Sequence, residues 1–136
     1  MLLDFGHNPV AIRSVIALAR SLVSPGRDLR ITIGMPGDRL DRELHAIAGE
    51  LAAGAPAEVV VRELSADLLR GRAPGEIPAV LVAGLRAHGV TSIGSATSEL
   101  EALDCLLATA VPGDVVLVLV HLEPAVLDRL APPESS

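Results

Sequence analysis

Short apolar runs of strand length alternate with longer helical patterns along almost the whole chain. The strand-length runs cover residues 2–5, 31–35, 58–63, 91–95 and 114–120, and apolar residues recur with the helical period between them. Strands that alternate with helices are joined by crossovers, which makes neighbouring strands parallel. The sequence therefore predicts an α/β domain with a Rossmann-like, mainly parallel sheet and helices on both faces.

The helical segments are expected at 10–23, from a cap at Asp38 to about Gly54, at 76–88, at 98–110 and at 124–130. Two of them carry clear apolar faces, which we list as Ile12, Val15, Ile16, Leu18, Ala19 and Leu22 for the first and Leu40, Leu44, Ile47, Ala48 and Leu51 for the second. One domain over residues 1–131 is predicted, with 132–136 as a flexible tail.

The composition of the chain disfavours several classes of ligand and site. The chain has 136 residues, a formal net charge of −6 and a single cysteine, Cys105, and all of its basic residues are Arg. The negative charge disfavours binding to nucleic acid and to acidic membranes. The lone cysteine and the absence of a long apolar run indicate a cytoplasmic protein. No pair of His residues has a metal-binding helical spacing, so no intrinsic metal site is predicted.

The first candidate site is Asp4-Phe5-Gly6-His7-Asn8-Pro9, which runs from a strand end into a helix start. Ligands of open α/β sheets gather outside the carboxyl ends of the strands. Asp4 is therefore a candidate acceptor for ribose hydroxyls, and His7 a candidate partner of a base or sugar. The alternative is structural, with Asp4 and Asn8 capping the helix, Pro9 in its first turn and His7 partly buried.

The second candidate site is Gly34-Met35-Pro36-Gly37-Asp38-Arg39-Leu40-Asp41. A Gly-rich turn that leads into a helix start presents backbone N–H groups to an anion. The segment lacks the spacing and the Lys of a nucleotide phosphate loop. A plain tight turn with Asp38 as the helix cap explains it equally well.

The third candidate site is Arg70-Gly71-Arg72-Ala73-Pro74-Gly75-Glu76. Two guanidinium groups in a Pro/Gly-bounded loop suit a carboxylate or a phosphate, and Glu76 suits an amine or one of the Arg side chains. A solvated charged loop is the alternative.

These three segments, in this order, resemble the C-terminal domain of the Mur ligases and most closely that of the cyanophycin synthetases. The first resembles the signature Asp-Tyr-[Ala/Gly]-His-Asn-Pro, with Phe5 in place of Tyr. The second resembles Gly-Xaa-Pro-Gly-Asp-Arg-Arg-Asp, with Leu40 in place of the second Arg, and the third resembles Arg-Gly-Arg-Xaa-Xaa-Gly-Glu. The Asp-Asn-Pro-Arg motif of the muramyl-peptide ligases is absent.

The resemblance implies a role for each segment in an ATP-dependent ligase that joins a carboxylate to an amine. It assigns nucleotide contacts to Asp4, His7 and Asn8, and contacts with an acidic amino-acid or peptide substrate to Asp38, Arg39, Arg70, Arg72 and Glu76. It also implies that ATP is the cofactor, with Mg²⁺ held by a central ATPase domain in cis or in trans. No residue of this chain is assigned a catalytic role.

Three functions therefore remain at the level of the sequence. The chain is interpreted first as the nucleotide- and substrate-closing domain of a ligase that is not catalytic alone. The alternatives are a stand-alone binding or regulatory module derived from that domain, and an independent small-molecule enzyme on the same scaffold.

Overall fold

A computed structural model describes residues 2–4, 9–35, 40–62, 71 and 73–119. The elements alternate as expected and are, in chain order, β1 (Leu2–Asp4), α1 (Pro9–Leu22), β2 (Leu29–Ile33), α2 (Asp41–Ala53), β3 (Glu58–Arg62), α3 (Glu76–Ala87), β4 (Ile93–Ala96), α4 (Glu99–Thr109) and β5 (Val115–Leu119). Their bounds agree with the predicted ones to within about two residues, which is the usual uncertainty at element ends. The expected helix at 124–130 and the tail lie outside the described residues.

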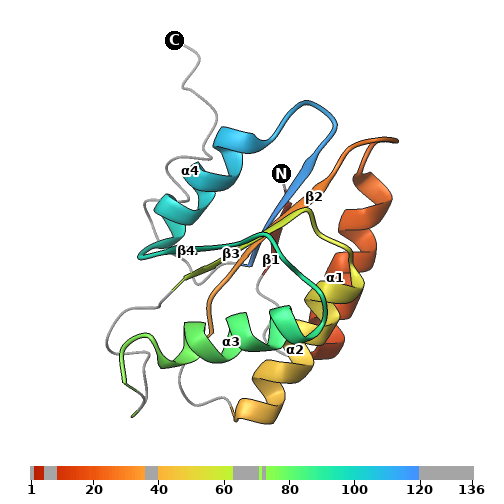
Figure 1. Ribbon diagram of the computed structural model, residues 1–136. Coiled ribbons are helices and arrows are strands. Elements are labelled where there is room, and N and C mark those ends of the chain that lie inside the picture. Colours follow the sequence, from red (N-terminus) through yellow and green to blue (C-terminus); the bar gives the residue numbers. More distant parts are fainter. Residues whose placement is uncertain (1, 5–8, 36–39, 63–70, 72, 120–136) are drawn as a thin grey trace.

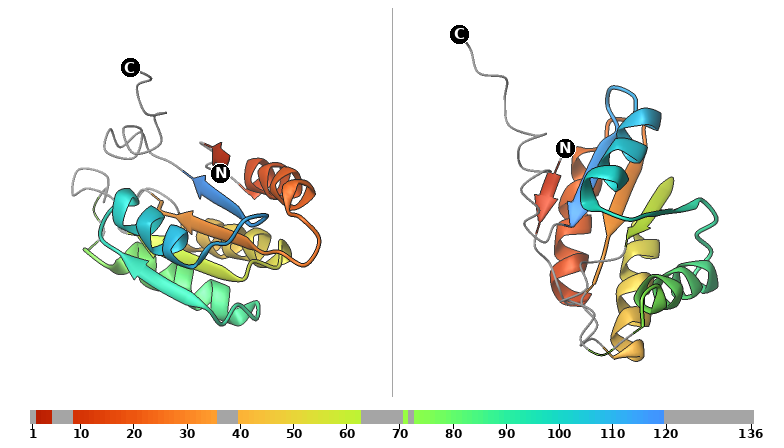
Figure 2. Two further views of the ribbon diagram at one scale, coloured as in Figure 1. Left: turned by 90° about the horizontal axis from the view of Figure 1, so that it is seen from above. Right: turned by 90° about the vertical axis from the view of Figure 1, so that its left-hand side faces the viewer.

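The five described strands form one parallel sheet in the order β1-β5-β2-β3-β4. The crossovers from β1 to β4 all advance in one direction, whereas the crossover from β4 to β5 returns and places β5 between β1 and β2. Because crossovers are right-handed, a reversal of direction moves the connecting helix to the opposite face. Figures 1 and 2 show the result: α1, α2 and α3 cover one face of the sheet and α4 covers the other.

Two apolar cores follow from this arrangement. The larger one joins α1, α2 and α3 to the strands, and the smaller one lies under α4 and includes Val60, Val116 and Val118. Consecutive strand residues thus face both cores, and β5 is buried at every position. This burial on both faces explains why the strands read as continuous Val, Ile and Leu runs.

Three residues that were placed on the apolar faces of helices are exposed. Leu18 and Leu22 of α1 are 50% and 55% exposed, and Leu40 is 51% exposed. Successive helical residues turn by about 100°, so Leu18 and Leu22 lie beside the stripe formed by Ile12, Ile16 and Ala19 rather than on it. Leu40 precedes the first helical residue of α2 and therefore does not share its buried face.

The amino ends of the strands, which we call the amino edge, are joined by an ionic network around Arg30 of β2. Its guanidinium donates to Glu58 Oε1 over 2.9 Å and to Asp114 Oδ2 over 3.3 Å. Asp114 also accepts backbone N–H donors from Val111 and Asp28, at 3.0 Å and 2.9 Å. The network links β2, β3 and the turn before β5 at the edge opposite the three motifs.

Candidate ligand site at the carboxyl edge

The carboxyl ends of the five strands lie along one edge of the sheet because every described strand pair is parallel. We call this the carboxyl edge; its strand-end residues are Asp4, Ile33, Arg62, Ala96 and Leu119. In chain order α3 follows β3 and lies on one face of the sheet, whereas α4 follows β4 and lies on the other. This divergence between neighbouring strands is the topological switch point at which ligands of open α/β sheets bind.

The first motif begins at this edge. Asp4 is the last residue of β1, and its backbone is in register with Leu119 at the end of β5. Pro9 begins α1, as its fixed φ and missing N–H favour. His7 and Asn8 lie outside the described residues. The described backbone thus places Asp4 next to the end of a central strand.

The second motif follows β2. Met35 is buried, with 2% of its surface exposed, and it belongs to the larger core. Asp38 and Arg39 lie outside the described residues. The helix does not start directly after Asp38 as predicted: Leu40 holds the cap position in an extended conformation, and its N–H donates to Glu43 Oε1 over 3.1 Å. The Glu43 carboxylate thereby delays the helix start to Asp41.

The third motif leads into α3. Arg70 and Arg72 lie outside the described residues, whereas Gly75 has a φ of 82°, a left-handed conformation that favours glycine. Glu76 is the first residue of α3, and its Oε2 accepts the N–H of Ala73 over 3.1 Å. The exposed Glu76 carboxylate therefore stabilises the turn into the helix, a structural role that the sequence interpretation did not assign to it.

A buried ion pair at the carboxyl edge was missed by sequence reasoning. Arg62 at the end of β3 and Glu99 at the start of α4 are both 0% exposed, and Arg62 Nη2 lies 2.6 Å from Glu99 Oε1. Arg62 also donates to Thr32 Oγ1 over 3.1 Å and to the Leu119 carbonyl. The available signal was an Arg directly following three Val residues of a buried strand, because a buried Arg requires partners.

The start of α4 has a side-chain cap. Ser98 Oγ accepts the N–H of Glu101 over 3.1 Å, and Thr97 donates its hydroxyl to the Glu101 carboxylate over 2.6 Å. Glu99 and Glu101 both lie in the first turn of α4, where acidic side chains are favourable. Glu99 has the additional role of pairing with Arg62.

A hollow of about 430 Å³ adjoins the third motif between α3 and β4. Its lining is Gly75, Pro78, Ala79, Val82, Ala83, Arg86 and Ser95. A single charged side chain, Arg86, is among these residues, so the hollow itself is largely apolar. It offers space beside the loop that precedes Glu76.

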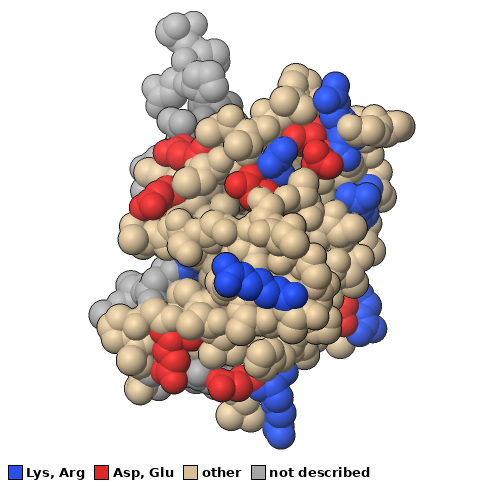
Figure 3. All heavy atoms as spheres, viewed as in Figure 1, with Lys and Arg blue, Asp and Glu red and all other residues tan. Residues whose placement is uncertain are grey.

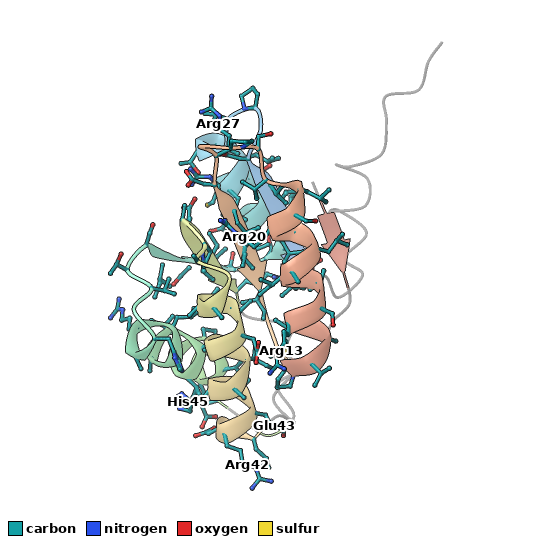
Figure 4. The ribbon with its side chains drawn as sticks, turned by 90° about the vertical axis from the view of Figure 1, so that its right-hand side faces the viewer. Arg13, Arg20, Arg27, Arg42, Glu43 and His45 are labelled. Carbon is teal, nitrogen blue, oxygen red and sulfur yellow. The ribbon has the colours of Figure 1, made fainter. Side chains whose placement is uncertain are left out.

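The α1–α2 surface carries a different charged group. Arg13 donates to both carboxylate oxygens of Glu50, over 2.6 Å and 3.0 Å, and this hydrogen bonding lowers the pKa of Glu50. Figure 4 shows Arg13 and Arg20 along α1, with Arg42, Glu43 and His45 at the start of α2 and Arg27 at the far end of the molecule. His45 is exposed.

The surface chemistry of the described part of the chain is mixed. On the face in Figure 3, acidic and basic side chains adjoin one another in the upper part of the view, and uncharged surface lies between them and the other charged groups. Among the described residues, no three His, Cys, Asp or Glu side chains are grouped as metal ligands. Within the same residues, every helix is too short or too polar to cross a bilayer.

Comparison with known proteins gives one family and one fold. Residues 1–120 match the family model described as "Mur ligase, glutamate ligase domain". A search of curated proteins found no match. A solved domain from Haemophilus ducreyi, described as part of a UDP-N-acetylmuramate:L-alanyl-gamma-D-glutamyl-diaminopimelate ligase, has 18% identity and a TM-score of 0.60, covering 94% of this chain and 85% of that one.

Proposed function

The chain belongs to the Mur ligase family, and from this membership we propose that it closes over nucleotide and substrate as the C-terminal domain of an ATP-dependent carboxylate–amine ligase. We propose further that this ligase is similar to cyanophycin synthetase and that the chain is not catalytic alone. The observation that carries the proposal is the common position of the three motifs. Each one follows the carboxyl end of a strand of a single parallel sheet.

The nucleotide part of the proposal rests on the first motif. Asp4 ends β1, and Asp4, His7 and Asn8 match the family signature residue for residue. In this role the Asp4 carboxylate accepts hydrogen bonds from ribose hydroxyls, and His7 contacts the base or sugar. Asn8, which follows His7 in the signature, is proposed as a third nucleotide contact.

The substrate part rests on the second and third motifs. In the sequence these two motifs follow β2 and β3. The two strands are parallel neighbours in the sheet, so their carboxyl ends lie next to each other. The proposed contacts with an acidic amino acid or peptide are Asp38, Arg39, Arg70, Arg72 and Glu76. Guanidinium groups suit this substrate because they bind carboxylates through two parallel hydrogen bonds.

A partner domain is part of the proposal because this chain contains no Lys for phosphate binding. The proposed partner is a central ATPase domain, in cis or in trans, that holds Mg²⁺ and the phosphates. When bound, ATP would supply the phosphoryl group that activates a carboxylate and would leave as ADP, and attack by an amine would then release phosphate and form the amide. In this proposal the residues of this chain bind and orient the nucleotide and the substrate, and they exclude water from the site. The activation barrier of ligation falls because the reacting groups are held in position.

The nucleotide role is tested by calorimetry with ATP·Mg and the chain alone, then with a purified central domain added. We expect weak binding to the chain alone, because one wall of the site is missing, and tighter binding with the partner. Asp4→Ala and His7→Ala should reduce the gain at least about tenfold, as expected for lost charge-assisted hydrogen bonds. Asp28→Asn, at the amino edge, is the matched control and should bind like the unchanged chain.

Micromolar binding of ATP·Mg by the chain alone, lost in Asp4→Ala, would refute the need for a partner domain. It would favour the alternative of a stand-alone binding or regulatory module. ATP hydrolysis by the pure chain would instead favour an independent enzyme.

The substrate role is tested in the reconstituted ligase with an aspartate-containing acceptor peptide. The double variant Arg70→Ala/Arg72→Ala should raise the KM for the acidic substrate while the KM for ATP stays unchanged. Arg20→Ala, on the outer surface of α1, is the control for the loss of positive charge. An equal rise in the KM for the acidic substrate and the KM for ATP would contradict the assignment of Arg70 and Arg72 as substrate contacts.

A further inference from the structure

The Arg62–Glu99 pair is the most deeply buried charged group in the described part of the chain, and the proposed ligand contacts do not use it. Both side chains are 0% exposed. The guanidinium of Arg62 contacts three other segments: Thr32 of β2, Glu99 of α4 and the Leu119 carbonyl of β5. Together with β3, which carries Arg62, the pair joins four elements at one point.

Stability alone does not account for such a pair. Removing two charges from water costs several kcal/mol per ion, and well-packed apolar residues of similar volume often stabilise a protein equally well. A guanidinium differs from an apolar side chain in geometry, because its N–H groups lie in one plane and point in fixed directions. Each partner must therefore occupy one position relative to Arg62.

All of the contacted groups lie at the carboxyl edge. Leu119 is the last residue of β5, Thr32 is the penultimate residue of β2, and Glu99 is the first residue of α4. Ser98 and Thr97, before Glu99, connect the same point to β4.

We propose that Arg62, with Glu99 as its counter-ion, is a positioning residue for the carboxyl edge. It sets the ends of β2, β3 and β5 against the start of α4. The inference rests on the proposed function in one respect only, namely that the ligand site lies at these strand ends.

The first test measures amide hydrogen exchange of the 136-residue chain without any nucleotide. The triple variant Thr32→Val/Arg62→Met/Glu99→Leu replaces the polar cluster by apolar side chains of similar size. Its urea unfolding midpoint should remain close to that of the unchanged chain. Amides of Ile33, Leu119 and Leu100 should nevertheless exchange about tenfold faster through local opening, while Ile31 and Val59 nearer the amino edge keep their rates.

Unchanged exchange at the carboxyl edge in a folded triple variant would overturn the proposal. If the triple variant fails to fold, the same exchange measurement on Arg62→Lys tests the proposal. This variant keeps the buried positive charge but loses the planar guanidinium group with its fixed N–H directions. Acceleration confined to the carboxyl edge in Arg62→Lys supports positioning. Uniform acceleration at both edges shows a general loss of stability and overturns it.

A second measurement connects the pair to ligation. In the ligase reconstituted with a central domain, the triple variant should lower kcat at least about tenfold, as misplacement of a positioned group does, and Arg62→Lys should restore part of it. A normal kcat in the folded triple variant would overturn the role of Arg62 in positioning the carboxyl edge for ligation. If the unchanged chain supports no ligation, the proposed function fails, whereas the exchange result still decides the role of Arg62.

Discussion

Gly84 of α3 lies against Ala48 of α2 so closely that a Cβ on Gly84 would stand 2.8 Å from the Ala48 Cβ. The same Cβ would stand 3.1 Å from His45 Nδ1. Both Gly84 and Ala48 are buried, and their helices pack side by side on one face of the sheet. The two small residues therefore set the separation of α2 and α3.

Gly84→Ala should destabilise the chain by about 1–2 kcal/mol, because overpacking costs roughly 1–3 kcal/mol and exceeds the helix propensity that Ala adds. Urea unfolding followed by circular dichroism measures the change. Gly94→Ala is the control, since a Cβ at Gly94 would meet Val60 Cγ2 at an ordinary 3.5 Å. A more stable Gly84→Ala would show that the helices separate at little cost.

The Asp114 carboxylate should make the stability depend on pH. Backbone N–H groups of Val111 and Asp28, together with Arg30, lower its pKa from an ordinary value of 3.8. A lowered folded pKa contributes stability that is complete above the unfolded pKa and is lost as the pH falls through the folded pKa.

Asp114→Asn should therefore unfold more easily than the unchanged chain at pH 7, and the difference should shrink below about pH 4, where the unfolded carboxyl takes up its proton. Urea midpoints between pH 2 and 7 measure this effect. Asp104→Asn, on the exposed face of α4, is the comparison variant. A constant difference across the whole range would contradict the linkage.

The Ser98 cap should contribute to the stability of α4. Ser98→Ala removes the acceptor of the Glu101 N–H and should cost about 1 kcal/mol, whereas Ser98→Asp keeps an acceptor and should restore most of the loss. Thermal unfolding of the three chains measures the order. Equal loss in the Ala and Asp variants would indicate that the Ser98 hydroxyl has another role.

Arg13 should control the pKa of Glu50 across the α1–α2 surface. Its hydrogen bonds to both oxygens lower that pKa, so Arg13→Ala should move it upward toward the ordinary glutamate range. An NMR titration of the carboxyl carbon follows the shift directly. Arg42→Ala, on the same helix as Glu50 but without a described contact to it, should leave the pKa in place. An unchanged Glu50 pKa in Arg13→Ala would show that the contact is not populated in solution.

Local patterns in the sequence were sufficient for the classes of elements and for much of the core. The Val59-Val60-Val61 row and the apolar stripe of Ile12, Ile16 and Ala19 depend on residue spacing within one element, and both are buried as expected. Leu18 was misassigned because the width of the buried face of α1 depends on the elements that pack against it. Leu40 was misassigned because the first residue of α2 depends on the cap made by Glu43. Neither property can be read from the spacing of apolar residues.

The sequence by itself determined an α/β domain whose three motifs follow strand ends, because the alternation of periods and the positions of Gly and Pro are local properties. Only the tertiary structure decided that β5 lies between β1 and β2 and that Arg62 meets Glu99. Both features depend on the crossover from β4 through α4 back to β5. This crossover brings Glu99 next to Arg62, which lies 37 positions earlier in the chain. Strand order and buried ionic contacts arise from the packing of whole elements, and no single segment of sequence encodes them.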